Sequence, residues 1–178
     1  RSPKDAHDLG IGMIHQHFKL VDVFTAVENI ALSMDKGEKF DLRRVRDKAR
    51  AICEKYQFAL DLDQKVYEMS VSQKQTLEIV KVLFRGADIL ILDEPTRGID
   101  VGAKYEIYCI IAELAKQGKS IIMISSEMSE IIGMSNRVMV MCDGRITGFI
   151  NGKDATQENI MALATQFETA PDAAAANQ

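Results

Sequence analysis

The chain has 178 residues, of which 47% are hydrophobic and 27% charged, and its formal net charge is −4. This composition is that of an ordinary globular domain, and the mild negative charge excludes the strongly basic type of nucleic-acid-binding domain. No apolar run approaches the roughly 18 residues that a membrane-spanning helix needs, so a transmembrane class is excluded as well.

The first half of the chain is predicted to be mostly helical. Residues 11–14 form a short apolar run typical of a buried strand, and a helix is expected over 27–32. From 41 to about 60, apolar residues recur every three or four positions, which predicts an amphipathic helix capped by Asp41. Another helix is expected over about 70–84.

The second half alternates strands with helices. The aliphatic run over 89–92 is typical of a strand that is covered on both faces. Further strands are expected over 120–125 and 137–142, with helices over 101–117 and 127–133 between them. This alternation predicts a parallel, doubly wound sheet.

The last part of the chain is expected to form a hairpin and one more helix. Asp143 and Gly144 favour a tight turn into a strand over 145–150. A helix is expected over about 156–167. The small and polar residues 170–178 are predicted to be disordered.

The three cysteines, Cys53, Cys109 and Cys142, lie far apart and form none of the short spacings of zinc or redox sites. An odd number of cysteines also argues against a secreted disulfide framework. We expect three reduced thiols in a cytosolic protein.

Two adjacent carboxylates, Asp93 and Glu94, follow the run over 89–92. A buried strand would place them at its carboxyl end, where open α/β sheets bind their ligands. One carboxylate can hold Mg²⁺ while its neighbour addresses a water molecule. The alternative is a strand that simply ends in a solvated acidic turn. Four aliphatic residues followed by Asp-Glu-Pro-Thr are uncommon in such a turn, and this pattern favours the functional interpretation.

These residues and several other motifs, in the same order, resemble those of ATP-binding cassette (ABC) ATPases. The strand ending in Asp93 and Glu94 resembles the Walker B motif, and Met13–Gln16 resembles the start of the Q-loop, with Gln16 as its glutamine. Met69–Gln73 lies where the family has its signature sequence. Arg97–Asp100 resembles the D-loop, and Ile124–Glu127 takes the place of the switch-histidine loop.

The resemblance implies an α/β fold of the P-loop NTPase type, in which a helical subdomain is inserted into a parallel-sheet core. We expect a partial ABC ATPase domain over 1–169, with the helical subdomain over about 17–85 and the α/β core over about 86–155.

The P-loop strand and helix are expected to be missing from this chain. A P-loop needs G-x-x-x-x-G-K-[ST], whereas the sole Gly-Lys-Ser, at 118–120, is preceded by Glu113 at the position of the first glycine. It also follows an expected helix instead of a strand. Because the family's P-loop precedes the Q-loop, we expect it to lie before Arg1.

The resemblance assigns catalytic roles to Glu94, Gln16 and Ser126 and a metal-binding role to Asp93, with ATP and Mg²⁺ as the implied ligands. Asp93 would hold Mg²⁺, and Glu94 would be the general base for the attacking water. Gln16 would contact both the metal and the γ-phosphate of ATP. Ser126 stands in place of the switch histidine and offers only a hydroxyl.

In the same family, the signature of one cassette completes the ATP site of another. Ser70, Ser72 and Gln73 would bind the γ-phosphate in the partner's site, and Asp100 would order the interface between the cassettes. Val71 and Ser72 replace the signature glycines, and a β-branched valine restricts how closely the backbone approaches phosphate. The resemblance therefore also allows a weakened site.

Within the family, the chain is most similar to the tandem-cassette ATPases of bacterial importers for monosaccharides and related ribosides. Residues 11–96 resemble a first cassette of the nucleoside branch, and residues 96–165 resemble a second cassette of the galactose or ribose branch, which predicts a fusion across the internal repeat. The implied partners are a second cassette, the permease subunits and, indirectly, a periplasmic or lipoprotein substrate-binding protein, with no nucleic acid. The implied location is the cytoplasmic face of the cell membrane.

Two functions remain open at this point. The chain is either part of an importer ATPase or a non-hydrolytic chain that only supplies a signature surface to a partner cassette. A non-transport ABC ATPase, such as a DNA-repair type, is a third alternative that no coiled-coil insertion supports.

Overall fold

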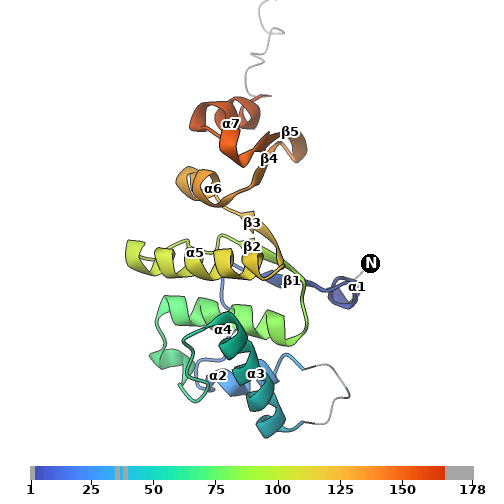
Figure 1. Ribbon diagram of the computed structural model, residues 1–178, viewed down its shortest axis with the longest axis vertical. Coiled ribbons are helices and arrows are strands. Elements are labelled where there is room, and N and C mark those ends of the chain that lie inside the picture. Colours follow the sequence, from blue (N-terminus) through green and yellow to red (C-terminus); the bar gives the residue numbers. More distant parts are fainter. Residues whose placement is uncertain (1–2, 35–36, 38–39, 167–178) are drawn as a thin grey trace, which may run out of the picture. The chain divides into compact units, whose positions relative to one another are not determined.

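The computed structural model describes residues 3–34, 37 and 40–166 (Figure 1). The chain divides into two compact units, Arg1–Ile124 and Ser125–Gln178, which are described in turn. The prediction of disorder over 170–178 lies outside the described residues. Among the helices that are described, none combines the length and the apolar character needed to cross a bilayer.

The first unit contains the helices and strands predicted for it, and two short helices, α1 and η1, that were not predicted. Its elements are α1 (Pro3–Asp8), β1 (Ile11–Ile14), α2 (Ala26–Ala31), α3 (Leu42–Tyr56), η1 (Val66–Glu68), α4 (Val71–Phe84), β2 (Ile89–Asp93), α5 (Val101–Lys116) and β3 (Ser120–Ile124).

The long amphipathic helix α3 begins as predicted but ends earlier. Asp41 is its N-cap, and its carboxylate accepts hydrogen bonds from the backbone N–H groups of Arg43 and Arg44. The helix ends at Tyr56 instead of near residue 60, because Gln57 adopts a left-handed backbone conformation with φ of 58°. Such a residue turns the chain away from the helix axis.

A parallel sheet of three strands, in the order β1-β2-β3, forms the centre of the first unit. The register pairs Ile14 with Leu92 and Leu92 with Met123. The parallel pairing predicted for these strands is confirmed, and β2 is the central strand.

One face of this sheet is buried and the other carries exposed apolar side chains. Leu90 and Leu92 are fully buried. Gly12, the register partner of Leu90, faces α4, because a Cβ on Gly12 would lie 2.1 Å from Cγ1 of Val82. Side chains alternate between the two faces of a strand. The sequence predicts that both faces of the sheet are covered, whereas in the part of the chain that the structure describes only the face that packs on α4 is covered. The opposite face holds three side chains that are 43–49% exposed: Met13, Ile122 and Ile124.

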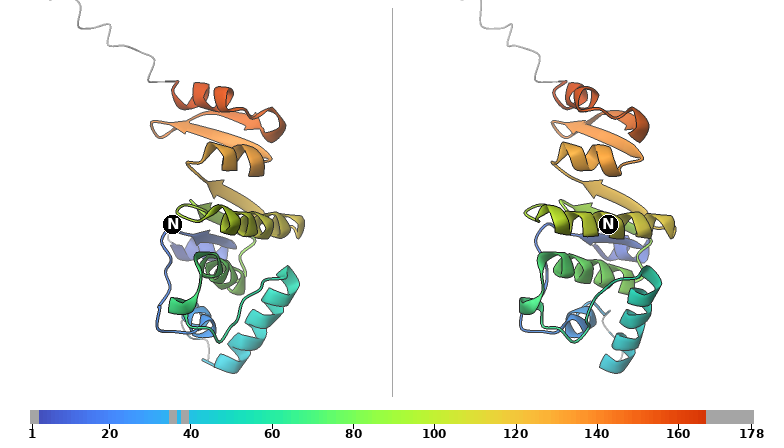
Figure 2. Two further views of the ribbon diagram at one scale, coloured as in Figure 1. Left: turned by 90° about the vertical axis from the view of Figure 1, so that its left-hand side faces the viewer. Right: turned by 60° about the vertical axis from the view of Figure 1, so that its left-hand side comes forward.

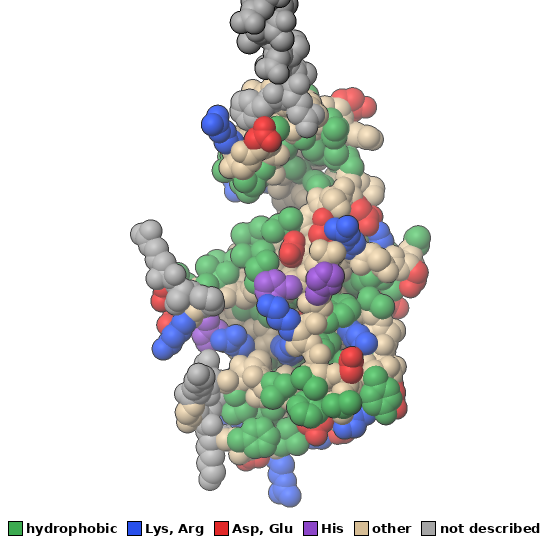
Figure 3. Space-filling model, turned by 180° about the vertical axis from the view of Figure 1, so that it is seen from behind, with side chains coloured by type: hydrophobic (Ala, Val, Ile, Leu, Met, Phe, Trp, Pro, Cys, Tyr) green, Lys and Arg blue, Asp and Glu red, His purple; other side chains and the backbone are tan. Residues whose placement is uncertain are grey.

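Helix α4 is the centre of the helical layer. It contacts β1 and α5 on the side of the sheet and α2 and α3 on the other (Figures 1 and 2). Leu77, Ile79 and Val80 on α4 are completely buried. Hydrophobic side chains also gather on one part of the surface of this unit (Figure 3).

The second unit is a two-stranded antiparallel ribbon packed against short helices. Its elements are α6 (Met128–Met134), β4 (Arg137–Cys142), β5 (Arg145–Asn151), η2 (Gly152–Asp154) and α7 (Gln157–Ala164). Val138, Val140 and Ile160 form much of its core. Helix α7 ends before the predicted residue 167, because Thr165 has left the helical conformation.

Strand β4 corrects one prediction. It does not extend the parallel sheet but pairs antiparallel with β5, so the alternation of strands and helices was wrongly extended to it. The predicted tight turn explains this pairing: Asp143 and Gly144 have φ values of 50° and 72°, the geometry that joins adjacent antiparallel strands.

The three cysteines are free thiols, as predicted. Cys53 and Cys142 are buried, and Cys109 is exposed.

Candidate nucleotide-binding site

Asp93 and Glu94 stand at the carboxyl end of the central strand β2, as predicted, and both are partly buried. Gln16 lies two residues beyond Ile14, just as Glu94 lies two residues beyond Leu92. Since Ile14 and Leu92 are register partners, Gln16 and Glu94 leave neighbouring strands at the same edge of the sheet. The structure therefore brings the predicted acidic pair and the predicted glutamine to one edge.

The backbone of Glu94 is in the left-handed region, with φ of 49°. Its N–H donates to the carbonyl of Ile124 at 2.8 Å, and its carbonyl accepts from the N–H of Arg97 at 3.2 Å. This conformation costs a non-glycine residue about 1–2 kcal/mol. Residues of this kind persist where the surroundings hold them, and they cluster at active sites.

Ser70, Ser72 and Gln73 lie together at the N-terminus of α4. Ser70 is the N-cap: its Oγ accepts from the N–H of Gln73 at 3.2 Å, while Oε1 of Gln73 accepts from the N–H of Ser70 at 2.9 Å. The hydroxyls of Ser70 and Ser72 are 3.0 Å apart, and Nε2 of Gln73 donates to Gln64. These predicted phosphate-binding side chains thus form a capping box, which satisfies two N–H groups of the helix end.

The remaining two predicted residues belong to other elements. Asp100 is the exposed N-cap of α5, and its Oδ1 accepts from the N–H of Ala103 at 3.1 Å. Ser126 is exposed and belongs to the second unit, between β3 and α6.

The Gly-Lys-Ser at 118–120 is a structural connection between α5 and β3, as predicted. The ammonium of Lys119 donates to the carbonyl of Ala87 at 2.8 Å and to Oδ1 of Asp88 at 2.7 Å. These contacts lie where β2 and β3 begin, at the edge opposite to Asp93 and Glu94.

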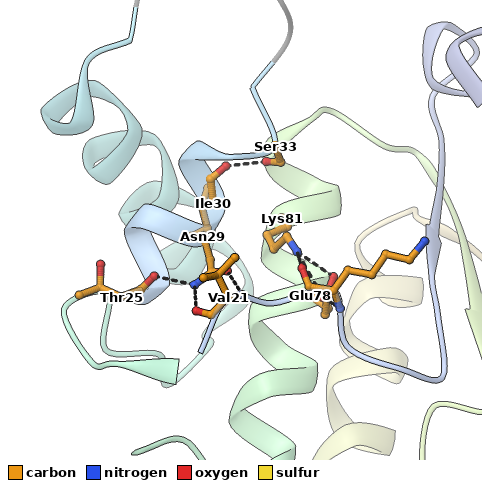
Figure 4. Close-up of polar contacts among 8 residues, drawn as sticks. Val21, Thr25, Asn29, Ile30, Ser33, Glu78 and Lys81 are labelled. Carbon is orange, nitrogen blue, oxygen red and sulfur yellow. Dashed lines mark hydrogen bonds and ion pairs between the residues drawn. The ribbon is translucent and has the colours of Figure 1, made fainter. Parts of the chain in front are cut away.

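Sequence reasoning missed a buried polar contact between α4 and the segment that follows Gln16 (Figure 4). Glu78 on α4 is 8% exposed, and its Oε1 accepts from the N–H of Lys19 at 2.7 Å. The ammonium of Lys81 donates to both carboxylate oxygens of Glu78 at 3.2 Å and to the carbonyl of Lys19 at 2.9 Å. The available signal is a carboxylate between Leu77 and Ile79 in an otherwise apolar stretch of helix.

Asn29 on α2 makes a second buried contact with the same part of the chain. It is 1% exposed; its Oδ1 accepts from the N–H of Val21 at 2.8 Å, and its Nδ2 donates to the carbonyls of Val21 and Thr25 at 3.1 and 3.0 Å. Every polar atom of this side chain is therefore paired.

The donor set at the end of β2 suits Mg²⁺, which prefers carboxylate and amide oxygens. Within the described part of the chain, no group of three or more His, Cys, Asp or Glu residues could hold a metal ion by itself. This fits an ion that takes one or two carboxylates from the protein and further ligands from phosphates.

A parallel sheet with an acidic pair at the end of its central strand defines an α/β protein of the P-loop NTPase type. The same fold is found in the crystal structure of a nucleotide-free ATP-binding cassette from an ABC transporter (TM-score 0.75, 20% identity, 91% of this chain and 68% of that chain). It is also found in cbiO1 of Clostridium perfringens, part of an ABC transporter complex (TM-score 0.74, 23% identity, 94% of this chain and 68% of that chain). The sequence profile of the ABC transporter family matches residues 2–97, and the chain belongs to this family.

The chain is also similar in sequence to three curated import ATP-binding proteins. The galactose/methyl galactoside import ATP-binding protein MglA of Clostridium tetani is 60% identical over 102 residues, which are 57% of this chain and 20% of that protein. The ribose import ATP-binding protein RbsA of Shigella dysenteriae is 43% identical over 168 residues (92% and 34%), and the nucleoside import ATP-binding protein NupA of Lactococcus lactis is 40% identical over 164 residues (91% and 32%). The chain spans about a third of the length of the curated relatives that it matches over most of its own length.

Proposed function

We propose that the chain is part of the ATP-binding subunit of a bacterial importer and couples ATP hydrolysis to the uptake of a monosaccharide or related riboside. The observation that carries this proposal is the pair Asp93 and Glu94 at the carboxyl end of the central strand, beside the strand that leads to Gln16. The sugar and nucleoside import named in the relatives supports the substrate class.

In the proposed reaction, the side chains at the sheet edge divide the work. Asp93 and Gln16 would hold Mg²⁺, which when bound would neutralise charge on the phosphates of ATP. Glu94 accepts the proton of the attacking water as general base. Its N–H bond to Ile124 and the turn to Arg97 fix the backbone from which this carboxylate projects.

The second part of the proposal concerns a site shared by two cassettes. Ser70, Ser72 and Gln73 would bind the γ-phosphate of ATP held by the partner cassette, exchanging bonds of the capping box for bonds to phosphate. Asp100 would order the interface between the cassettes. Ser126 would contribute its hydroxyl to the γ-phosphate in place of a histidine.

Partners and location follow from the same proposal. Residues 17–85 are the helical subdomain, and they contact the permease at the cytoplasmic face of the membrane; the substrate-binding protein takes part indirectly. Exposed apolar side chains in this subdomain support a protein contact. They include Val23, Phe24, Leu32, Phe40 and Tyr67.

A second candidate is a non-hydrolytic chain that only supplies its signature surface to a partner. It is favoured by the sole Gly-Lys-Ser, whose lysine is already engaged by Ala87 and Asp88. No other segment of the sequence offers a P-loop lysine in the required spacing.

The test joins residues 1–178 to a P-loop segment of an ABC ATPase and measures ATP binding and phosphate release. Glu94→Gln should keep ATP binding and lower turnover by a factor on the order of 10²–10⁴, because it removes the general base. The control Glu68→Gln changes an exposed carboxylate on η1 and should leave turnover unchanged. Near-normal hydrolysis by the Glu94→Gln fusion would exclude Glu94 as the general base. A fusion with the wild-type Glu94 that binds ATP but releases no phosphate would favour the second candidate.

A further inference from the structure

The segment between β1 and α2 carries Gln16 and is attached to α4 at two residues: Lys19 through its backbone, and Asp22 through an exposed ion pair with Lys74 at 3.7 Å. Residues 15–20 form neither helix nor strand. Both backbone groups of Lys19 are bonded by side chains of α4: the N–H by Glu78 at 2.7 Å and the carbonyl by Lys81 at 2.9 Å. We call Glu78 and Lys81 the Lys19 anchor.

The Lys19 anchor is shielded from solvent. The side chains of Glu78 and Lys81 are 10% and 13% exposed, and they pair with each other at 3.2 Å (Figure 4). Low exposure strengthens such bonds and makes an unpaired partner costly. Removing the Glu78 carboxylate would take away the acceptor of both the Lys81 ammonium and the Lys19 N–H. The anchor therefore depends on all three groups.

A second attachment lies two residues further along the chain. Asn29 bonds both backbone groups of Val21 and is itself almost fully buried. Lys19 is therefore fixed to α4 and Val21 to α2. Gln16, three residues before Lys19, lies between this fixed stretch and the end of β1.

Helix α4 connects the Lys19 anchor to the proposed signature residues. It runs without interruption over Val71–Phe84, and Glu78 lies about 10 Å along its axis from its first residue. A displacement of the helix end that carries Ser70 and Gln73 therefore reaches Lys19 through one rigid element.

We propose that Glu78 and Lys81 are positioning residues for Gln16, which tie the segment of Gln16 to the helix that carries the signature residues. Movements at the two parts of the nucleotide-binding machinery are then coupled through α4. This inference rests on the proposed function for the roles of Gln16 and the signature residues. The attachment itself is a property of the chain without nucleotide.

The test uses the 178-residue chain labelled with ¹⁵N and no nucleotide. Amide hydrogen exchange and ¹⁵N relaxation are measured for Gln16, Lys19 and Val21 in the wild type and in Glu78→Ala. We expect exchange at Lys19 to become at least about tenfold faster, since a bond from an N–H to a buried carboxylate is lost. The backbone of Gln16 should become more mobile on the picosecond to nanosecond timescale, while Ile79 on α4 keeps its protection.

Two further variants make the result specific. Glu78→Gln retains an oxygen that can accept from the N–H of Lys19. The amide of Lys19 should therefore exchange more slowly in Glu78→Gln than in Glu78→Ala. Lys81→Gln removes the cation that holds the Lys19 carbonyl and tests the same attachment if Glu78→Ala does not fold. Asp63→Asn is the control, because it breaks another carboxylate–cation pair, Arg46–Asp63, which joins α3 to the stretch before η1 instead of joining α4 to Lys19.

Faster exchange at Lys19 and higher mobility at Gln16 in the anchor variants, with Asp63→Asn unchanged, would support the proposal. Unchanged order at Gln16 in folded Glu78→Ala or Lys81→Gln would overturn it, as would equal exchange at Lys19 in Glu78→Ala and Glu78→Gln. Because no nucleotide is present, failure here is distinct from failure of the hydrolysis test on Glu94.

Discussion

Replacing Gly12 with alanine tests how closely β1 packs on α4. A Cβ at this position would lie 2.1 Å from Cγ1 of Val82 and 3.0 Å from Cβ of Ala87. Carbon atoms attract one another best at about 3.5–4.0 Å, so the first contact is too short by roughly 1.5 Å. Val82 is β-branched and has few alternative rotamers. We expect Gly12→Ala to lower the free energy of unfolding by about 1–3 kcal/mol, the usual cost of overpacking.

Urea unfolding followed by far-ultraviolet circular dichroism measures this change. Gly102→Ala is the control, because a Cβ there meets its nearest atom, Oδ1 of Asp100, at 3.4 Å. Alanine is the better helix former, so this variant should be unchanged or more stable by up to about 1 kcal/mol. Adding Val82→Ala to Gly12→Ala should recover part of the loss. A Gly12→Ala chain with the unfolding midpoint of the wild type would refute the close packing of β1 on α4.

Four other expectations can be checked on the same chain. The exposed Cys109 should react with a thiol reagent at about pH 8 while Cys53 stays unmodified, because burial raises the pKa of the Cys53 thiol to about 11. Mass spectrometry of the labelled peptides measures this, and modification of Cys53 before Cys109 would contradict it. The stability that Cys53 contributes through this shift is complete below the ordinary thiol pKa and is lost as the pH rises through about 11. Asn29→Asp removes the amide that donates to Val21 and Thr25, and should lower the free energy of unfolding by about 2 kcal/mol; equal stability in urea would show that the assigned amide contacts are not made. The 178-residue chain alone should bind ATP weakly and release no phosphate, because its sequence has no P-loop motif; steady turnover by a monomer with micromolar affinity would contradict this.

Features that follow from local physics could be predicted from the sequence. The apolar run before Asp93 predicts the central strand and the position of the acidic pair. Asp41 marks the start of α3, and the Asp143–Gly144 pair marks the turn between β4 and β5. Each depends on residues within a few positions of one another.

Features that depend on distant contacts could not be predicted. Glu78 is 59 positions from Lys19, and nothing near either residue indicates that they bond. The left-handed backbone of Glu94 depends on β3, which supplies the carbonyl of Ile124. Gln57 ends α3 although glutamine is an ordinary helix former, so the helical pattern continues past the point where the helix stops.

The backbone of Glu94 has a consequence for any attempt to engineer this chain by selecting for thermal stability. With φ of 49°, the position is one where glycine, or to a lesser degree asparagine, is intrinsically better suited than glutamate. A library screened only for resistance to heat would therefore tend to replace the very carboxylate proposed to act on water. Survivors of such a screen would be expected to be robust and inactive, and residue 94 should be held constant while the rest of the sheet edge is varied.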